Sequence, residues 1–177
     1  MFTKLLVAID LSSRNEDVFT AGFDLAQKMG ASLMLLHVPS SDAPECPTLP
    51  TMPGLDYYQP STSTASMIEI YEKQWRAYEE KGLEMLKYFA QKARQAGVAV
   101  EYTQNGGAPG KTICHLAHNI DADLILIGRR GHSGLNELMI GSVSNYVMHH
   151  ASCSVLIVQH GDRVNVHQPV PTIAANA

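Results

Sequence analysis

A stretch near the carboxyl end of the chain, from Gly128 to Ser144, combines the residue types that bind anions. Its glycines let backbone N–H groups approach an anion closely, because no Cβ atom stands in the way. A helix is expected to begin at Gly141, and the first turn of a helix carries unpaired N–H groups and the positive end of the dipole. Two serines add hydroxyl groups to that turn, and one of Arg129 and Arg130 is expected to face it with a positive charge. The stretch therefore predicts phosphate binding.

The same residues also have a purely structural interpretation. Glycines often follow strands, and Ser142 is a residue type that caps helices. The residues alone leave both interpretations open. Other motifs are absent from the sequence: there is no Walker lysine motif, no G-x-G-x-x-G after the first apolar run, and no G-x-S-x-G nucleophile elbow. A P-loop, a dinucleotide fingerprint and a hydrolase elbow are thus excluded.

Predicted strands must position this stretch. Short apolar runs predict them at residues 5–9, 32–38, 123–127 and 154–158, and an alternating pattern at residues 98–103 predicts a strand nearer an edge of the sheet. Helical spacing separates them, so strands and helices alternate. This order predicts an α/β fold, a five-stranded parallel doubly wound sheet with helices on both faces, in a Rossmann-like three-layer α/β/α arrangement. In the strand order 3-2-1-4-5, the order reverses between the first and fourth strands, which end at Asp10 and Gly128. Ligands bind at such a reversal, so the site is expected there.

Two local patterns predict where helices lie. Ser13 and Glu16 have the spacing of a capping box and predict the start of the first helix. From Ile68 to Ala96 the apolar residues recur every three or four positions, which predicts one continuous buried stripe. Trp75 lies on this stripe and is interpreted as a core residue.

Residues 39–65 are rich in proline, serine and threonine and show no period, so they are expected to form a long surface loop. This segment contains Tyr57 and Tyr58, which leave open an alternative in which it covers the site or contacts a partner. Residues 1–160 are expected to form one domain, and residues 161–177 a flexible tail.

Composition excludes several classes of protein. The 177 residues carry a formal charge of −4, which argues against a general nucleic-acid binder. No apolar run is long enough for a signal peptide or a membrane span. The three cysteines are widely spaced and suit a reducing compartment, so the expected location is cytoplasmic, with no membrane partner.

The spacing of three glycines resembles a known signature. Gly128, Gly131 and Gly141, followed by Ser142, match the G-2x-G-9x-G-(S/T) pattern of the ATP-binding universal stress proteins. The resemblance covers nearly the whole chain: the run that ends at Asp10, the run that ends at Val38, the turn from Gly107 to Pro109, the segment from Ala122 to Gly134, and the residues from His150 to Cys153 all resemble parts of that family.

The resemblance implies a role for each matched residue. Asp10, with Ala8 and Ile9, would hold the ribose or the adenine edge, and Val38 would pair with adenine through its backbone. Ile127 and Gly128 would lie near the ribose. The phosphates would be held by Arg130, Gly131, Gly141, Ser142, Val143 and Ser144. The implied cofactor is ATP or AMP, with any Mg²⁺ bound through the phosphates. From the residues themselves, Asp10 also has the simpler interpretation of a capping or turn residue.

The resemblance further implies a nucleotide-dependent stress-response sensor or regulator with an unknown protein partner. It implies a homodimer through the last strand, Ser154–Val158, since an open apolar edge strand needs cover. Three features depart from the family: Leu11 follows Asp10, Ser154 stands where proline is common, and the loop 39–65 is long.

Two other functions remain as alternatives. A slow ATPase would need a positioned base, and His132 is the candidate beside the phosphates. An interaction protein would act through loop 39–65. Cys114 and His118 have a spacing that can hold a metal, but no second pair accompanies them, so no protein-bound metal and no catalytic residue are predicted.

Overall fold

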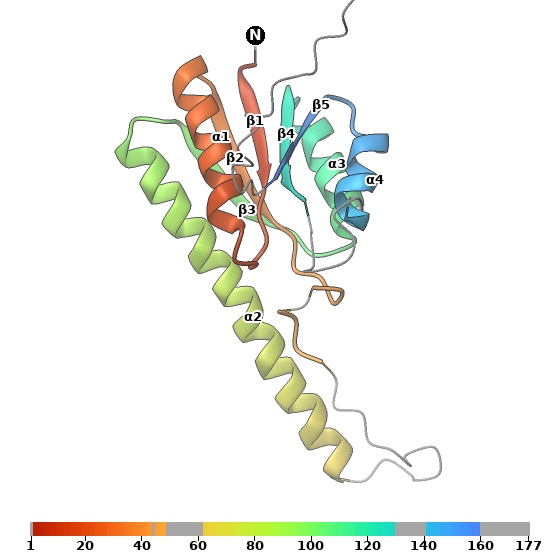
Figure 1. Cartoon of the computed structure of the whole chain (residues 1–177). Helices are drawn as coiled ribbons and strands as arrows, with labels where there is room; N and C mark the ends of the chain where they lie inside the picture. Colours follow the sequence, from red (N-terminus) through yellow and green to blue (C-terminus); the bar gives the residue numbers. More distant parts are fainter. Residues whose placement is uncertain (1, 44, 49–61, 130–140, 160–177) are drawn as a thin grey trace, which may run out of the picture.

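The computed structural model describes residues 2–43, 45–48, 62–129 and 141–159. Its strands form one parallel sheet in the order β3-β2-β1-β4-β5, which confirms the predicted fold and the reversal beside β1 (Figure 1). The elements in chain order are β1 Lys4–Ala8, α1 Asn15–Met29, β2 Ser32–His37, α2 Thr62–Gln95, β3 Val100–Gln104, α3 Pro109–Asn119, β4 Leu124–Gly128, α4 Ser142–His150 and β5 Ser154–Val158.

Helices cover both faces of the sheet. Side chains along β1 alternate between the faces, as strand geometry requires. Leu5 and Val7 lie in a core with residues of α1 and α2, whereas Leu6 and Ala8 lie in a second core with residues of α3 and α4. Figure 1 shows these two helix pairs on opposite sides of the sheet. Because β1 is buried on both faces, its sequence is a continuous apolar run.

The register brings the carboxyl ends of three strands together. Ala8 at the end of β1 lies opposite Leu36 of β2 on one side and Ile127 of β4 on the other. At the other end of the sheet, one Asp123 carboxylate oxygen accepts hydrogen bonds from the backbone of Thr3 and Lys4, at 2.7 and 2.9 Å. These bonds and one from the Thr3 hydroxyl lower the pKa of Asp123 to about 2. The two ends of β1 are thus fixed against β4.

The predicted capping box at the start of α1 is wrong. The residue before the helix is Arg14, and no side chain caps this end. Glu16 instead forms an ion pair with Lys92 of α2 at 3.3 Å. The turn is held by other bonds, because the Asn15 N–H donates to the Ser12 carbonyl at 3.2 Å. Competition from the Asp10–Ser12 turn described below replaces the expected cap.

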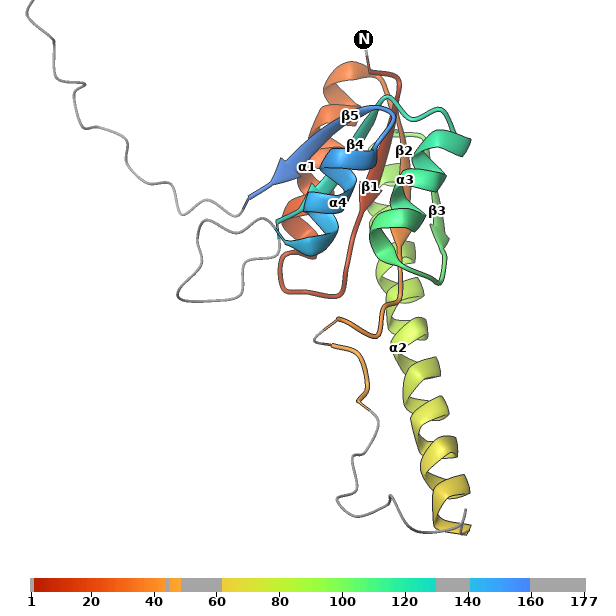
Figure 2. The same ribbon diagram turned by 90° about the vertical axis from the view of Figure 1, so that its right-hand side faces the viewer.

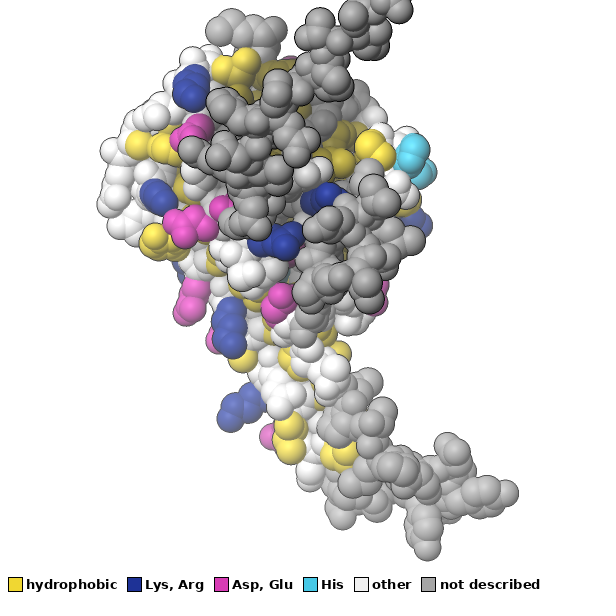
Figure 3. All heavy atoms as spheres, viewed as in Figure 1, with side chains coloured by type: hydrophobic (Ala, Val, Ile, Leu, Met, Phe, Trp, Pro, Cys, Tyr) yellow, Lys and Arg dark blue, Asp and Glu magenta, His cyan; other side chains and the backbone are white. Residues whose placement is uncertain are grey.

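The apolar stripe of α2 is buried only in part, which corrects the prediction of a continuous core. Phe89 and Ala93 are buried against the sheet, but Ile68 is 51% exposed and Ala96 is exposed. The amino-terminal half of α2 extends beyond the edge of the sheet (Figure 2), with hydrophobic and charged side chains intermixed along it (Figure 3). Helix α2 is longer than the face of the sheet on which it packs, so the periodic pattern of its apolar residues continues beyond the buried core.

Residues 40–43 and 45–48 contain side chains that pack on the projecting part of α2. Ala43 and Cys46 are buried against Tyr78, with Leu11 and Trp75 packed at the border of this small cluster. Trp75 is therefore half-buried rather than a core residue. Leu11, which departs from the family pattern, has its contacts here.

The remainder of the predicted loop 39–65 is described only in part. Helix α2 begins at Thr62, inside the predicted loop. Residues 49–61, with Tyr57 and Tyr58, and the predicted tail 161–177 lie outside the described residues. Within the described part of the chain, none of the helices is long and apolar enough to cross a membrane.

Gly82 lets helix α2 lie close against the sheet. A Cβ atom there would overlap Nδ1 of His37 and lie 2.5 Å from Oε1 of Gln104. We expect Gly82→Ala to lower the free energy of unfolding by about 1–3 kcal/mol, the usual cost of overpacking. The gain in helix propensity, about 1 kcal/mol, offsets only part of this. Urea unfolding measures the change, and Gly106→Ala is the control, since no atom lies within 4 Å of that position. An unchanged midpoint for Gly82→Ala would contradict this packing.

Candidate functional site

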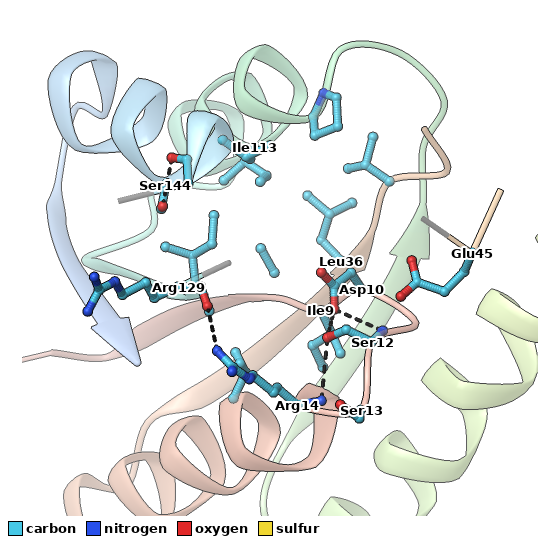
Figure 4. Close-up of a pocket in the computed structure, with 18 residues that line it drawn as sticks. Ile9, Asp10, Ser12, Ser13, Arg14, Leu36, Glu45, Ile113, Arg129 and Ser144 are labelled. Carbon is cyan, nitrogen blue, oxygen red and sulfur yellow. Dashed lines mark hydrogen bonds between the residues drawn. The ribbon is translucent and has the colours of Figure 1, made fainter. Parts of the chain in front are cut away.

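A pocket of about 360 Å³ lies at the carboxyl ends of β1, β2 and β4, where the strand order reverses (Figure 4). The amino-terminal ends of α3 and α4 and the turn before α1 complete its wall. Its size is in the range of small-molecule sites. The fold thus forms a cavity at the edge where doubly wound sheets bind ligands.

Most of the residues predicted from the sequence come together in this pocket. Those that line it are Ala8, Ile9, Asp10, Val38, Ile127, Gly128, Gly141, Val143 and Ser144. Ser142 is the exposed first residue of α4 and does not line it. Arg130, Gly131 and His132 lie outside the described residues.

The Asp10 side chain has two roles in this structure: it closes a turn and it lines the pocket. Its Oδ1 accepts hydrogen bonds from the Ser12 N–H at 3.1 Å and from the Ser12 hydroxyl, so the side chain closes the turn that leads to α1. Asp10 also lines the pocket. The turn interpretation is therefore confirmed, and it leaves the carboxylate at the pocket wall rather than removing it.

The amino-terminal end of α4 faces the pocket without a side-chain cap. Gly141 precedes the helix with φ −60° and ψ 152°, and no side chain caps this end of α4. The Ser144 hydroxyl, 1% exposed as a residue, donates to the Gly141 carbonyl at 3.0 Å. Ser144 thus contributes its backbone at this turn, and its hydroxyl stabilises the turn instead of pointing at a ligand. First-turn N–H groups are the donors that anions use at helix ends.

Two arginines lie beside the end of β4. Nη1 of Arg14 donates to the Arg129 carbonyl at 3.3 Å. The Arg129 N–H donates to the Val158 carbonyl at 3.0 Å, which ties this residue to β5. Nε of Arg129 is buried and has no hydrogen-bond partner among the described residues. Both residues line the pocket, so its β4 side carries positive charge.

Charge is distributed unevenly along the pocket. Asp10 and Glu45 lie toward β2, and Ser144 and Arg129 lie on the opposite side, toward α4 (Figure 4). Apolar side chains lie between, among them Leu36 and Ile113. The cavity thus offers acceptors at one end, an apolar middle and donors at the other.

Several lining residues were not predicted from the sequence; they are Ser12, Ser13, Arg14, Val18, Leu36, Glu45, Pro109 and Ile113. Ser12 to Arg14 follow the end of β1, where the site was expected. Their place in the sequence could therefore have indicated that they line the pocket. Pro109 lies in the turn already noted as a family feature. Glu45 lies in an irregular segment, and no pattern in the sequence points to it.

Gly128 lets β4 approach α1. A Cβ atom at this residue would lie 3.0 Å from Cγ2 of Val18, which is tighter than ordinary contact. This glycine thus has a packing role besides its place in the pocket wall.

Cys114, the candidate metal ligand, does not line the pocket. Burial raises the pKa of its thiol, and the described residues contain no group of three or more potential metal ligands.

His37 lies beneath the pocket, one residue before Val38. It is 1% exposed, and its Nδ1 bonds Oε1 of Gln104 at 2.9 Å, while Nε2 is buried with no partner among the described residues. Burial lowers the pKa of His37 from 6.5, against the opposing effects of Gln104 and the charge of Asp10. The folded protein therefore holds this imidazole neutral.

This shift predicts a loss of stability in acid. The pKa of His37 is lower in the folded than in the unfolded chain, so below pH 6.5 the unfolded chain binds more protons. We expect its contribution to be complete above pH 6.5 and to be lost as the pH falls toward the lowered pKa. An NMR titration of the imidazole resonances should give a midpoint below 6.5 for His37. A His37 midpoint at or above 6.5 would contradict the buried neutral state.

Comparison with known proteins supplies a family. Residues 1–159 match the model of the universal stress protein family. The universal stress protein Sll1388 of Synechocystis is 35% identical over 159 residues, covering 90% of this chain and 99% of that protein. The universal stress protein YxiE of Bacillus subtilis is 33% identical over 159 residues, covering 90% and 100%.

Solved structures share the fold. The protein MJ0577 matches with a TM-score of 0.67 and 20% identity, over 92% of this chain and 99% of that one. A universal stress protein in complex with cAMP matches with a TM-score of 0.59 and 22% identity, over 89% and 97%. A family protein from Arabidopsis thaliana with AMP bound matches with a TM-score of 0.54 and 20% identity, over 90% and 93%. Sequence identities of this size show a shared fold alone, whereas the match of residues 1–159 to the family model establishes the family. The chain belongs to the universal stress protein family.

Proposed function

We propose that this protein binds an adenine nucleotide in the pocket at the ends of β1, β2 and β4. The observation that carries the proposal is the distribution of charge along the cavity: Asp10 and Glu45 lie toward β2, the uncapped end of α4 lies on the opposite side, and Arg14 and Arg129 lie at the end of β4. A nucleotide has the complementary distribution, because its sugar hydroxyls and amino group donate hydrogen bonds and its phosphates accept them. Each end of the ligand would meet groups of the opposite kind.

This distribution orients the nucleotide. The base would lie toward β2, near Val38, and the ribose near Asp10 and Gly128. The phosphates would lie at the first turn of α4, where the N–H groups after Gly141 point outward from the helix end. Two family members of the same fold were solved with cAMP and with AMP, which supports an adenine ligand. The described residues hold no group of three potential metal ligands, so Mg²⁺ would arrive with the phosphates.

Calorimetric titration with ATP and AMP tests the proposal. We expect saturable binding of about one nucleotide per chain, and mass spectrometry of the denatured protein should detect adenine nucleotides that were retained during purification. Absence of a nucleotide in both measurements would refute the proposal. Phosphate release, measured in parallel, should not exceed background; a faster rate lost in His132→Ala would establish the alternative, a slow ATPase.

We infer that the nucleotide state is read by a partner protein during stress. The alternative function, partner contact through the loop 39–65, involves the same pocket. Glu45 of this loop lines the pocket, while its neighbours Ala43 and Cys46 pack on α2. Deleting residues 49–61 tests the interaction role: unchanged nucleotide affinity with loss of a partner would assign the loop to partner contact.

We also propose that the chain dimerises through β5. This strand is an edge of the sheet, and Leu156 on it is 39% exposed. Open edges of this kind favour pairing with another strand. Analytical ultracentrifugation should give the mass of a dimer, and Leu156→Asp should shift it to a monomer, because like charges would face each other across the two-fold axis. The control is Ile68→Asp, on the projecting half of α2. A dimer that survives Leu156→Asp but not Ile68→Asp would move the interface to α2.

A further inference from the structure

Arg14 is the lining residue with the least expected position. It precedes α1, on the face of the sheet opposite α4, and is outside the glycine signature. Its guanidinium nevertheless reaches the end of β4 and donates to the Arg129 carbonyl at 3.3 Å. Figure 4 shows this group near that carbonyl, whereas the Arg129 side chain extends away from Asp10 and Glu45. The Arg14 guanidinium thus lies at the end of β4, although Arg14 itself directly precedes α1.

The charge of Arg14 is not neutralised within the described part of the chain. The ion pairs of the described residues are Arg76 with Glu72 and Lys92 with Glu16. Glu16, two residues after Arg14, pairs with Lys92, and Asp10 directs Oδ1 to Ser12. The bond that Arg14 makes is to a neutral carbonyl, which leaves its positive charge available to an anion.

The two anion-binding features lie on different walls of the pocket. The helix end at Gly141 belongs to the α3–α4 side, and Arg14 belongs to the α1 side. One phosphate at the α4 end would satisfy the first-turn N–H groups. Further phosphates add charge and length, and they need a second group of positive charge beyond that turn.

We propose that Arg14 senses the number of phosphates, so that the pocket prefers a nucleoside di- or triphosphate to a monophosphate. The inference rests on the proposed function, since it concerns the same pocket. Arg14 would bind the phosphates beyond the first, while the α4 turn binds the first one in every nucleotide. A hydrogen bond to a charged group contributes about 10- to 100-fold in affinity. The preference for ATP over AMP should have this size.

Paired substitutions separate charge from structure. Arg14→Gln removes the charge but can still donate to the Arg129 carbonyl, and Arg14→Lys keeps the charge. Calorimetry with ATP, ADP and AMP, with and without Mg²⁺, compares both variants with the wild type. Arg76→Gln is the control, because this arginine lies on exposed α2 and pairs with Glu72. Melting temperatures of all variants show whether each is folded.

We expect the wild type to bind ATP and ADP about 10- to 100-fold more tightly than AMP. Arg14→Gln should lose this preference by weakening ATP and ADP while AMP changes less than about threefold, and Arg14→Lys should retain most of it. Equal weakening of all three nucleotides in Arg14→Gln would make Arg14 a structural residue and overturn the inference. An unchanged ratio would overturn it too. If the wild type binds no nucleotide, the proposed function itself fails.

Discussion

Gly141→Val should abolish nucleotide binding, with a loss of at least about 100-fold in affinity. The valine side chain would occupy the space of the phosphate and remove several of its charge-assisted hydrogen bonds. Gly141 lines the pocket directly before α4. Its φ of −60° is open to any residue, so the backbone does not require glycine here. The fold should therefore survive, with a melting temperature close to that of the wild type. Calorimetry with ATP and AMP measures the loss.

Gly106→Val is the matched control for this variant. It places the same side chain on another glycine, with no heavy atom within 4 Å and outside the pocket. Its affinity should equal that of the wild type. Wild-type affinity in Gly141→Val, in a protein of normal melting temperature, would mean that the phosphates bind elsewhere.

Phe19→Ala should cause the largest loss of stability, about 3–5 kcal/mol in the free energy of unfolding. Phe19 is 0% exposed and belongs to the core between the sheet and the helix pair α1 and α2. Its ring stacks on Phe89 of α2 with the centroids 4.3 Å apart. Removal leaves a cavity where α1 and α2 meet, and marginal stability makes this a large part of the total. Urea unfolding followed by circular dichroism measures the change.

Tyr88→Ala is the comparison for an exposed aromatic side chain, on α2 beside Phe89. Tyr88 is 59% exposed, so its loss should change the free energy of unfolding by no more than about 0.5 kcal/mol. Similar losses in the two variants would show that the contact between α1 and α2 contributes little, and would contradict the core as described.

Most of the sheet could be predicted because its central strands, β1 and β4, are buried on both faces and are therefore short continuous apolar runs. The edge strand β5 is more exposed, and it also begins and ends where its apolar run predicted. The ends of α1 and α2 were harder. At Ser13 a local pattern suggested a cap, but the bond between Ser12 and Asp10 determines the turn instead. At Ile68 a helical stripe continues where no partner surface covers it, and periodicity alone cannot indicate how far the core extends.

The candidate site was predictable where it depends on topology and on glycine spacing. Asp10 and Gly128 follow adjacent strands, so the strand order brings them together. Contacts that depend on side-chain direction were not predictable. The Ser144 hydroxyl turns back to the Gly141 carbonyl, and the Arg14 guanidinium crosses to β4. Glu45 reaches the pocket from an irregular segment, which has no period to reveal its direction.

Amide chemical shifts on addition of AMP test the central claim most directly. The protein has 177 residues, so a ¹⁵N-labelled sample gives one resolvable signal for most backbone N–H groups. The account predicts that saturating AMP shifts the signals of Asp10, Val38, Gly128 and Gly141, and leaves those of Gly30 and Asp123, at the opposite end of the sheet, unchanged. Shifts confined to that opposite end or to the projecting half of α2, or no shifts at any concentration of AMP, would contradict the account.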